Sequence, residues 1–341
     1  MIAVLMTMRK EDFMTRILSN ITAVAGLALF SGVALAQPKT DPQGYPARPI
    51  RIIVPNTAGS ATDGVTRIIA QRLTETMGQQ TVVDNRAGAS GIIGHEITMQ
   101  AVPDGYTVLV STSAGLVLNP LLMKVPYDPH RDFTPISLLV ISPQMLVSHA
   151  GLPARTVDEL VALARAKPGQ LNCASPGFGT SNHLGCEMLK TMTSVNFLHV
   201  PYKGTAPAIT DVVGGQVQFM FNSMPAVYPL AKAGKLRALA HGGTKRSPAA
   251  PEVPTVAETI PGFQCITWYA LVAPRGTPPA IVARLNAEVV KMFADAPFAQ
   301  RIVDQGQEPQ SSTPAELLAH MRAESARWSE VIKRAGLKLE R

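Results

Sequence analysis

The feature that most constrains the fold is a plan that the chain uses twice: an apolar strand-like run, a loop of glycine, serine and threonine, and an amphipathic helix. The copies are IRIIVPNTAGSATDGVTRIIAQRL, from Ile50 to Leu73, and LNCASPGFGTSNHLGCEMLKTM, from Leu171 to Met192. Alternating strand and helix patterns predict βαβ units with parallel strands. With 341 residues, 46% of them hydrophobic, the chain is long enough for one large α/β unit or two domains.

Periodicity and turn residues predict further elements of the same kind. The expected strands are residues 49–55, 80–84, 106–111, 133–139, 144–148, 171–174, 197–200, 218–221, 236–241 and 267–273. The expected helices are residues 63–77, 88–101, 157–167, 181–192, 205–214 and a helical C-terminal stretch. Capping boxes at 156–159 and 313–316 begin two of them. We therefore expect an α/β fold with mostly parallel sheets.

Residues 1–36 have the features of a secretory signal peptide. An apolar run begins at Ile21, follows Arg16, and ends in a small-x-small cleavage site from Ala34 to Ala36. The alternative, a transmembrane anchor, needs a longer apolar run. No cysteine follows the cleavage site, so a lipoprotein anchor is not expected. In a bacterium, the sequence predicts export to the periplasm or the medium.

Charge and cysteine content narrow the classes of function. The net charge of +7 does not predict nucleic-acid binding, because lysines and arginines are scattered and not interleaved with aromatic residues. A mild positive field instead favours anionic ligands. Three cysteines, Cys173, Cys186 and Cys265, lack zinc-site spacing, so no metal is expected. We expect them to be small buried hydrophobic residues, with a Cys173–Cys186 bridge as the alternative.

The two loops are suited to binding anions. Each loop follows a strand at its carboxyl end, where α/β folds bind ligands. The helix that follows presents free N–H groups and the positive end of its dipole. Two such loops that face each other across a cleft would bind a dianion through charge-assisted hydrogen bonds, each worth about 1.5–3 kcal/mol.

Enzymatic alternatives find little support. The chain has no P-loop, no complete dinucleotide fingerprint and no nucleophile elbow. Ser181 and His183 lie only two residues apart at the start of a helix, so their side chains diverge. We interpret His183 as a structural histidine, with Glu187 as its surface partner. The sequence therefore predicts a binding protein without cofactors, and not an enzyme.

Ten segments, in order, resemble the periplasmic solute receptors of tripartite tricarboxylate transporters, known as Bug proteins. The segments are YPARPIRIIVP, TDGVTRIIAQRL, VVDNRAGASG, PDGYTVLVST, VPYDPHRDFTPIS, ASPGFGTSNHL, HVPYKGTAPAITDVVGGQVQFMF, AGKLRALAHGGTKRSP, VPTVAETIPGF and APRGTPPAIVARLN. The resemblance implies a two-domain periplasmic-binding-protein (Venus flytrap) fold with a discontinuous first domain. Residues 44–142 plus 264–341 would form domain 1, and residues 143–263 would form domain 2.

The resemblance also implies the ligand contacts. These are Asn56, Thr57, Ala58, Gly59, Ser60 and Thr62 in the first loop; Ser175, Gly177, Phe178, Gly179, Thr180 and Ser181 in the second; and Ser113 and Asn222. The first loop lacks the aromatic residue and two glycines of the family pattern, which predicts a more polar and slightly narrower pocket floor. Asn222 stands where the family often has aspartate, which predicts a ligand without a free amino group. Phe178 would supply an apolar wall.

The sequence favours a monomeric periplasmic receptor. It would bind a small carboxylate, such as a di- or tricarboxylate or an aromatic acid, and deliver it to the membrane subunits of a tripartite tricarboxylate transporter. Two alternatives remain: a periplasmic sensor that signals to a membrane histidine kinase, and an exported hydrolase. Sequence alone does not name the ligand.

Overall fold

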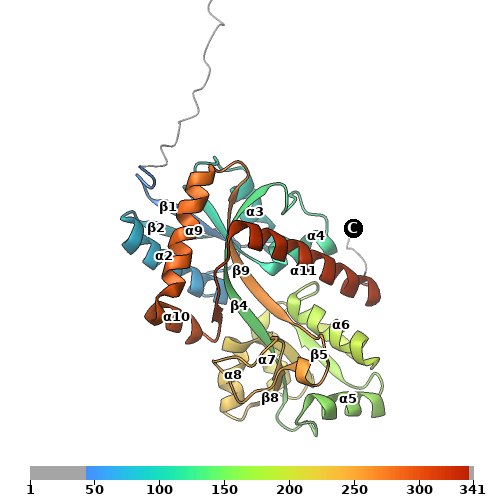
Figure 1. Cartoon of the computed structure of the whole chain (residues 1–341). Coiled ribbons are helices and arrows are strands. Elements are labelled where there is room, and N and C mark those ends of the chain that lie inside the picture. Colours follow the sequence, from blue (N-terminus) through green and yellow to red (C-terminus); the bar gives the residue numbers. More distant parts are fainter. Residues whose placement is uncertain (1–43, 338–341) are drawn as a thin grey trace, which may run out of the picture. The chain divides into compact units, whose positions relative to one another are not determined.

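A single ten-stranded sheet organises the molecule, in the strand order β2-β1-β3-β9-β4-β7-β5-β6, with β8 and β10 also paired with β4 (Figure 1). The computed structural model describes residues 44–337, and the predicted signal peptide lies outside them. The strands are β1 (Ile50–Val54), β2 (Thr81–Asn85), β3 (Thr107–Thr112), β4 (Phe133–His149), β5 (Asn172–Ser175), β6 (Leu198–Pro201), β7 (Phe219–Ser223), β8 (Leu236–His241), β9 (Ile266–Pro274) and β10 (Glu308–Pro309).

Helices follow most of these strands. They are α2 (Ala61–Met77), α3 (Ile92–Met99), α4 (Asn119–Leu122), α5 (Val157–Ala166), α6 (Ser181–Thr193), α7 (Thr205–Val213), α8 (Met224–Lys232), α9 (Pro279–Ala294), α10 (Ala296–Val303) and α11 (Pro314–Arg334). Short helical turns occupy Ala89–Gly91, Ala114–Leu118 and Val256–Glu258. Within residues 44–337, no helix combines the length and the apolar character needed to cross a membrane.

Parallel pairing is confined to two groups of three strands. Strand β1 pairs in parallel with β2 and β3, and β5 pairs in parallel with β6 and β7. Between these groups, β9 is antiparallel to β3 and β4, and β4 is antiparallel to β7, β8 and β10. The expected α/β architecture is confirmed, but the sheet is mixed, because the two longest strands join the parallel groups in the opposite sense.

Strand β4 corrects the prediction of separate strands at 133–139 and 144–148. It is continuous over 17 residues and changes partners along its length. Phe133–Pro143 pairs with β9, and Gln144–His149 pairs with β7 and β8. Pro143 suggested a break between two strands because it has no N–H to donate. It is tolerated within β4 because it lies where pairing with β9 ends and pairing with β7 and β8 begins.

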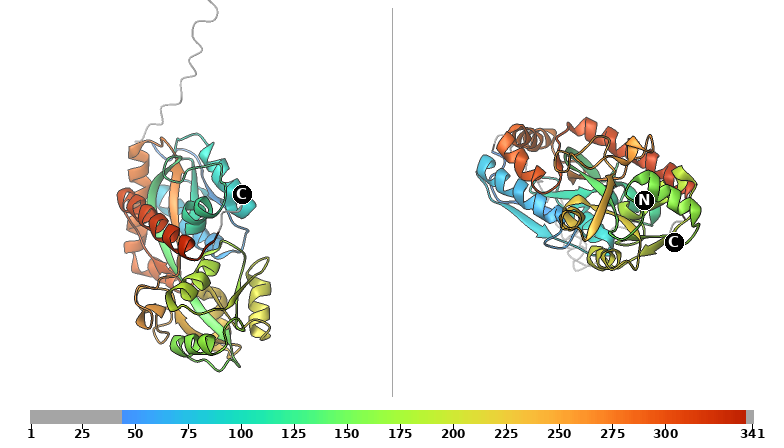
Figure 2. Two further views of the ribbon diagram at one scale, coloured as in Figure 1. Left: turned by 90° about the vertical axis from the view of Figure 1, so that its right-hand side faces the viewer. Right: turned by 90° about the horizontal axis from the view of Figure 1, so that it is seen from below.

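The apolar core forms three clusters. One contains residues between Tyr45 and Val140 together with residues between Tyr269 and Ile302, and another contains only residues between Met145 and Val253. The third draws on both regions and includes Trp268 of β9. In Figure 1, β4 and β9 lie side by side and link the helices α2, α9 and α10 to the helices α5, α7 and α8. The side view in Figure 2 shows α11 over these two strands.

Local signals at helix ends were mostly correct. Thr313 and Glu316 form the predicted capping box at the start of α11. Thr156 caps α5, but the carboxylate of Glu159 accepts from the N–H of Arg155 and not from that of Thr156. The predicted helix at 88–101 begins late, at Ile92, because Gly88, Ala89, Ser90 and Gly91 all have positive φ. Helix α8 was missed, since its sequence contains Pro225 and Pro229.

The expectation of unpaired cysteines holds for Cys265 and is wrong for Cys173 and Cys186, which form the bridge that the sequence left as the alternative. Cys173 of β5 and Cys186 of α6 form a disulfide, with Cα atoms 6.4 Å apart. Cys265 is a buried free thiol. The disulfide therefore joins the strand before the second loop to the helix after it.

Candidate functional site

The first loop connects β1 to α2 and is held mainly by one carboxylate. Asp63 accepts hydrogen bonds from the N–H of Gly59 at 2.9 Å, from Asn85 Nδ2 at 3.0 Å and from Arg67 Nε at 3.0 Å. Burial raises the pKa of Asp63, but these donors outweigh it, so the pKa lies below its ordinary value. Gly59 has φ +79°, a conformation that a side chain would strain.

The rest of the first loop is open to solvent. Thr57, Ala58 and Gly59 are exposed, whereas Thr62 is buried. Ser60 caps α2 by accepting from the N–H of Asp63. The N–H groups of the first turn of α2 have no partner inside the helix and point out of its N-terminus. The first loop thus presents free donors beside a buried threonine.

The second loop connects β5 to α6 and is fixed by several internal hydrogen bonds. Ser175 Oγ donates to the carbonyl of Gly177 at 2.9 Å and accepts from its N–H at 3.2 Å. Thr180 Oγ1 donates to the same carbonyl at 2.8 Å and caps α6 by accepting from the N–H of His183. Phe178, at the tip, is 40% exposed. The expected strand, loop and helix plan holds here, with more side-chain hydrogen bonds inside the loop than in the first loop.

Two stacked histidines support this loop from behind. The rings of His183 and His199 lie 3.8 Å apart, and His199 Nε2 lies 2.7 Å from Ser175 Oγ. His183 Nδ1 accepts from the N–H of Gly179 at 3.1 Å. Burial, together with His199 and Lys190, lowers the pKa of His183 to about 3. His183 is therefore a neutral structural group, as interpreted from the sequence.

Glu187 is not the surface partner that the sequence suggested. It is only 6% exposed, and its Oε1 lies 3.9 Å from His183 Nε2. Burial raises the pKa of this carboxyl group, and Lys190 opposes the rise. Helix α6 is more deeply buried than its sequence implied, because α11 and the disulfide cover it.

Strand β9 brings the two loops into one region. Ser181 Oγ, at the start of α6, lies 2.9 Å from Thr267 Oγ1. The hydroxyls of Thr62 and Ser142 neighbour the hydroxyl of Tyr269 and oppose the rise in its pKa that burial causes. Alternate residues of a strand point to the same face, so Thr267 and Tyr269 share a face. The start of α6 and the start of α2 therefore approach the same face of β9.

The two single positions lie close to the same strands. Ser113 directly follows Thr112, which pairs with Tyr269 of β9. Asn222 is buried on β7 and pairs with Met145 of β4. The helical segment after Ser113 also reaches the second loop, since a Cβ at Gly179 would lie 3.2 Å from Leu122 Cδ1.

Several buried polar atoms in this region have no hydrogen-bond partner among the described residues. They are Asn56 Oδ1, Ser113 Oγ and Ser142 Oγ, the last of which neighbours the Tyr269 hydroxyl, and Asn222 Nδ2, whose side chain shares a face with Met145, opposite that of Gln144. Three of them belong to residues that the sequence had assigned to the ligand. Since a buried polar group without a partner costs free energy, such atoms mark a place where water or a ligand completes the hydrogen bonding.

A chain of hydrogen bonds that the sequence did not reveal joins α6 to the long strands. Asn182 Nδ2 donates to Gln144 Oε1 at 2.7 Å and to the carbonyl of Phe221 at 3.0 Å. Gln144 Nε2 donates to Thr267 Oγ1 at 3.1 Å. The sequence signal was weak: Gln144 and Thr267 are polar residues within strands whose neighbouring side chains are largely apolar.

Comparison with known proteins gives consistent results. A family model described as tripartite tricarboxylate transporter family receptor matches residues 65–337. Protein BugT of Bordetella pertussis is 36% identical over 329 residues, covering 95% of this chain and 99% of BugT.

Two solved structures carry a named ligand. R. palustris Rpa4515 with adipate is 37% identical, with a TM-score of 0.79 over 86% of this chain and 99% of that one. MatC (Rpa3494) from Rhodopseudomonas palustris with bound malate is 33% identical, with a TM-score of 0.73 over 84% of this chain and 100% of that one. Both neighbours hold a dicarboxylate.

Proposed function

Because this chain belongs to the tripartite tricarboxylate transporter receptor family, we propose that it is a periplasmic receptor for a small aliphatic dicarboxylate. The observation that carries the proposal is the approach of two helix N-termini, those of α2 and α6, to one face of β9 beside buried polar atoms without partners. Two relatives with the same fold hold adipate and malate, which are dicarboxylates.

The proposed site binds carboxylates mainly through neutral donors. The residues assigned to it include no lysine or arginine, so hydroxyls, side-chain amides and N–H groups would provide the contacts. Each loop would bind one carboxylate at the start of its helix, where free N–H groups and the helix dipole favour negative charge. Phe178, which is 40% exposed, would cover the aliphatic part of the ligand.

Asn222 and the lack of an acidic side chain among the assigned residues favour a ligand without an amino group. Among residues 44–337 the Asn222 amide Nδ2 has no acceptor, whereas Oδ1 already accepts from the N–H of Ser223 at 2.8 Å. A free donor suits a ligand carboxylate or hydroxyl and does not suit an ammonium group. We therefore place adipate-like and malate-like acids ahead of acidic amino acids.

We further propose the domain boundaries that the resemblance implied, 44–142 plus 264–341 and 143–263. Chain crossings within β4 and just before β9 would then form the hinge, and ligand binding would favour the closed arrangement. The contact of Ser181 with Thr267 links the second loop to that hinge.

A thermal-shift panel on the chain from Gln37 onward tests the ligand class. Adipate and malate should raise the melting temperature, because a ligand at 100 times its Kd adds about 2.7 kcal/mol of stability. Aspartate and glutamate should have much weaker effects. Asn56→Ala and Ser113→Ala should weaken dicarboxylate binding about tenfold each, a loss of about 1.4 kcal/mol. Thr210→Ala, exposed on α7, is the matched control.

A response to amino acids alone would contradict the proposed ligand class, and unchanged binding in Asn56→Ala and Ser113→Ala would contradict the proposed site. Delivery to a transporter is a separate proposal, and crosslinking of the ligand-bound protein in its native membranes tests it. Recovery of a histidine kinase in place of transporter subunits would favour a sensor.

A further inference from the structure

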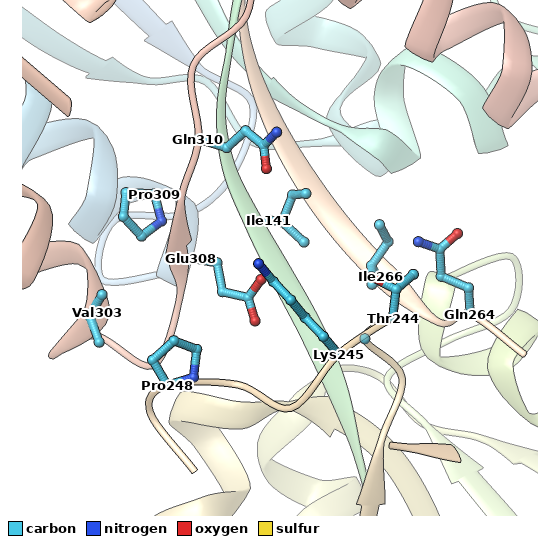
Figure 3. Close-up of a pocket in the computed structure, with 11 residues that line it drawn as sticks. Ile141, Thr244, Lys245, Pro248, Gln264, Ile266, Val303, Glu308, Pro309 and Gln310 are labelled. Atoms are coloured by element: carbon cyan, nitrogen blue, oxygen red, sulfur yellow. The ribbon is translucent and has the colours of Figure 1, made fainter. Parts of the chain in front are cut away.

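A cavity of about 570 Å³ contains none of the residues assigned to the carboxylate site. Its lining includes Ile141, Lys245, Gln264, Ile266, Glu308 and Gln310 (Figure 3). One side comes from the loop 243–248, part of the AGKLRALAHGGTKRSP segment, and the other from residues 303–310. In the proposed division these segments belong to different domains, so the cavity lies between the domains.

The cavity lies on the opposite face of the long strands from the carboxylate site. Ile266 lines the cavity, whereas the next residue of β9, Thr267, contacts Ser181. On β4, Ile141 lines the cavity, whereas the next residue, Ser142, neighbours Tyr269. Because successive side chains of a strand point to opposite faces, the two sites are separated by the strands themselves.

Glu308 places an incompletely satisfied carboxylate in this cavity. Its Oε1 is buried and has no hydrogen-bond partner among residues 44–337. Burial raises the pKa of Glu308, while the Ser247 hydroxyl and the Lys245 charge oppose the rise. Strand β10 fixes its position, since Glu308 pairs with Ile141 of β4.

Lys245 supplies the opposite charge from across the cavity. Figure 3 shows the side chains of Lys245 and Glu308 pointing toward one another from the two segments. The ends of its loop are fixed by buried His241, whose ring nitrogens lie 3.1 Å from the N of Gly243 and 3.2 Å from the N of Ser247. Lys245 itself is exposed and free to adjust.

We propose that this cavity is a second ligand site and that it binds an aliphatic α-amino acid as its zwitterion. The ammonium group would bind Glu308, the carboxylate would bind Lys245, and the side chain would lie against Ile141 and Ile266. Gln264 and Gln310, which also line the cavity, provide further donors and acceptors. This second site is separate from the carboxylate site of the proposed function. Its ligand carries an amino group, which the carboxylate site is expected to disfavour.

The charge arrangement selects the zwitterion over singly charged molecules. A simple amine would satisfy Glu308 but meet Lys245 with like charge, and a simple carboxylate would satisfy Lys245 but meet Glu308 with like charge. Ile141, Ile266 and Val303 give the cavity an apolar wall, which favours a branched aliphatic side chain over a polar one. Because a bound molecule would touch both proposed domains, it would stabilise one of their arrangements over others.

Isothermal titration of the chain from Gln37 onward with L-leucine tests the proposal. L-leucine should bind, and 4-methylpentanoate and 3-methylbutylamine, which each keep one charge, should bind at least about tenfold more weakly, a difference of about 1.4 kcal/mol. Glu308→Gln should lose leucine binding and gain preference for 4-methylpentanoate. Lys245→Met should lose leucine binding and gain preference for 3-methylbutylamine. A merely structural role for either residue would not reverse the preference.

Binding of each ligand to the variants of the other site tests whether the two sites are independent. Asn56→Ala and Ser113→Ala should leave leucine binding unchanged, and Lys245→Met should leave adipate binding unchanged. Absence of leucine binding up to about 10 mM, far above the range of specific receptors, overturns the second site. Equal binding of the singly charged compounds overturns it, and so does loss of leucine binding in Asn56→Ala. The first two outcomes leave dicarboxylate binding untouched, and the third would place leucine in the carboxylate site, so failure of the second site is distinguishable from failure of the first.

Discussion

The two loops of the proposed carboxylate site share a sequence plan but differ in how they are held. In the first loop, the carboxylate of Asp63 accepts the hydrogen bonds that hold the backbone, and Thr57, Ala58 and Gly59 are exposed. In the second loop, a disulfide, a pair of stacked histidines and Ser175 hold the backbone from several sides. Glycine-rich composition therefore does not by itself determine how firmly a loop is held, because the surrounding contacts differ between the two loops.

The difference suggests that the two loops contribute differently to ligand binding. A loop that is already ordered loses little conformational freedom on binding, which favours affinity. An exposed loop is able to change its contacts and so accommodates different acids. On this view the second loop provides a constant contact, and the first loop, where this chain departs from the family pattern, sets the choice of ligand.

Removal of the disulfide should have the largest effect. Cys173→Ala with Cys186→Ala should lower the free energy of unfolding by about 3 kcal/mol, the value expected for a closed loop of this size. Urea denaturation with and without reductant measures it, and reduction should bring the native protein down to the level of the variant. If reductant changes nothing in the native protein, the second loop is not held in this way.

Asp63 is the corresponding test of the first loop. Asp63→Ala removes a buried acceptor of several donors and should cost about 2 kcal/mol, in the range of hydrogen bonds to a charged group. Because its pKa in the folded protein is lowered, the contribution is present above the pKa of the unfolded chain and is lost as pH falls through the folded value. Urea denaturation near pH 7 and near pH 3 should show the difference between native protein and variant shrinking at the lower pH. A constant difference would contradict the role of the charge.

His183 and His199 should make the free energy of unfolding fall with falling pH, as Asp63 does, but beginning at a higher pH. Burial lowers the pKa of His183 to about 3 and that of His199 to about 4, so the unfolded chain binds more protons below pH 6.5. Stability should fall as pH falls from about 6.5 toward 4, by up to about 1.4 kcal/mol per unit for His183 and by less for the partly exposed His199, whose charge solvent screens. His183→Asn, which retains an acceptor for Gly179, should reduce this slope by about one histidine.

The smallest expected effect is the loss of a helix cap, which can be compared directly between the two loops. Thr180→Ala and Ser60→Ala each remove a cap, which costs about 1 kcal/mol. Thr180 also donates to the carbonyl of Gly177, so its loss should exceed that of Ser60 by about 0.5 kcal/mol. Thermal unfolding of the two variants side by side measures it, and a larger loss for Ser60 would reverse the assignment of the rigid loop.

Features that depend on nearby residues were predictable. The strand, loop and helix plan, the caps at Thr156 and Thr313, and the structural role of His183 follow from a few neighbouring residues. The two-domain fold and the class of protein came from the resemblance, which extends over nearly the whole mature chain.

Features that depend on distant residues were not predictable. The contact of Ser181 with Thr267 joins residues 86 apart in the sequence, and no local pattern indicates it. The continuity of β4 was hidden by Pro143, whose position is tolerated only because the partner strands change there. The burial of Glu187 depends on elements packed from elsewhere in the chain, α11 among them.

The place of β9 in the sheet has a consequence for how the protein is made. Strand β9 lies between β3 and β4 in the sheet, although more than a hundred residues of sequence separate it from both strands. A chain that emerges from its N-terminus, at the ribosome or across a membrane, therefore exposes an unpaired edge of β3 until residue 274 has emerged. Such edges pair readily with other chains. The sheet around β1, β2 and β3 is therefore completed only when the last third of the chain has emerged. A chaperone that covers the edge of β3 until then would prevent its pairing with other chains.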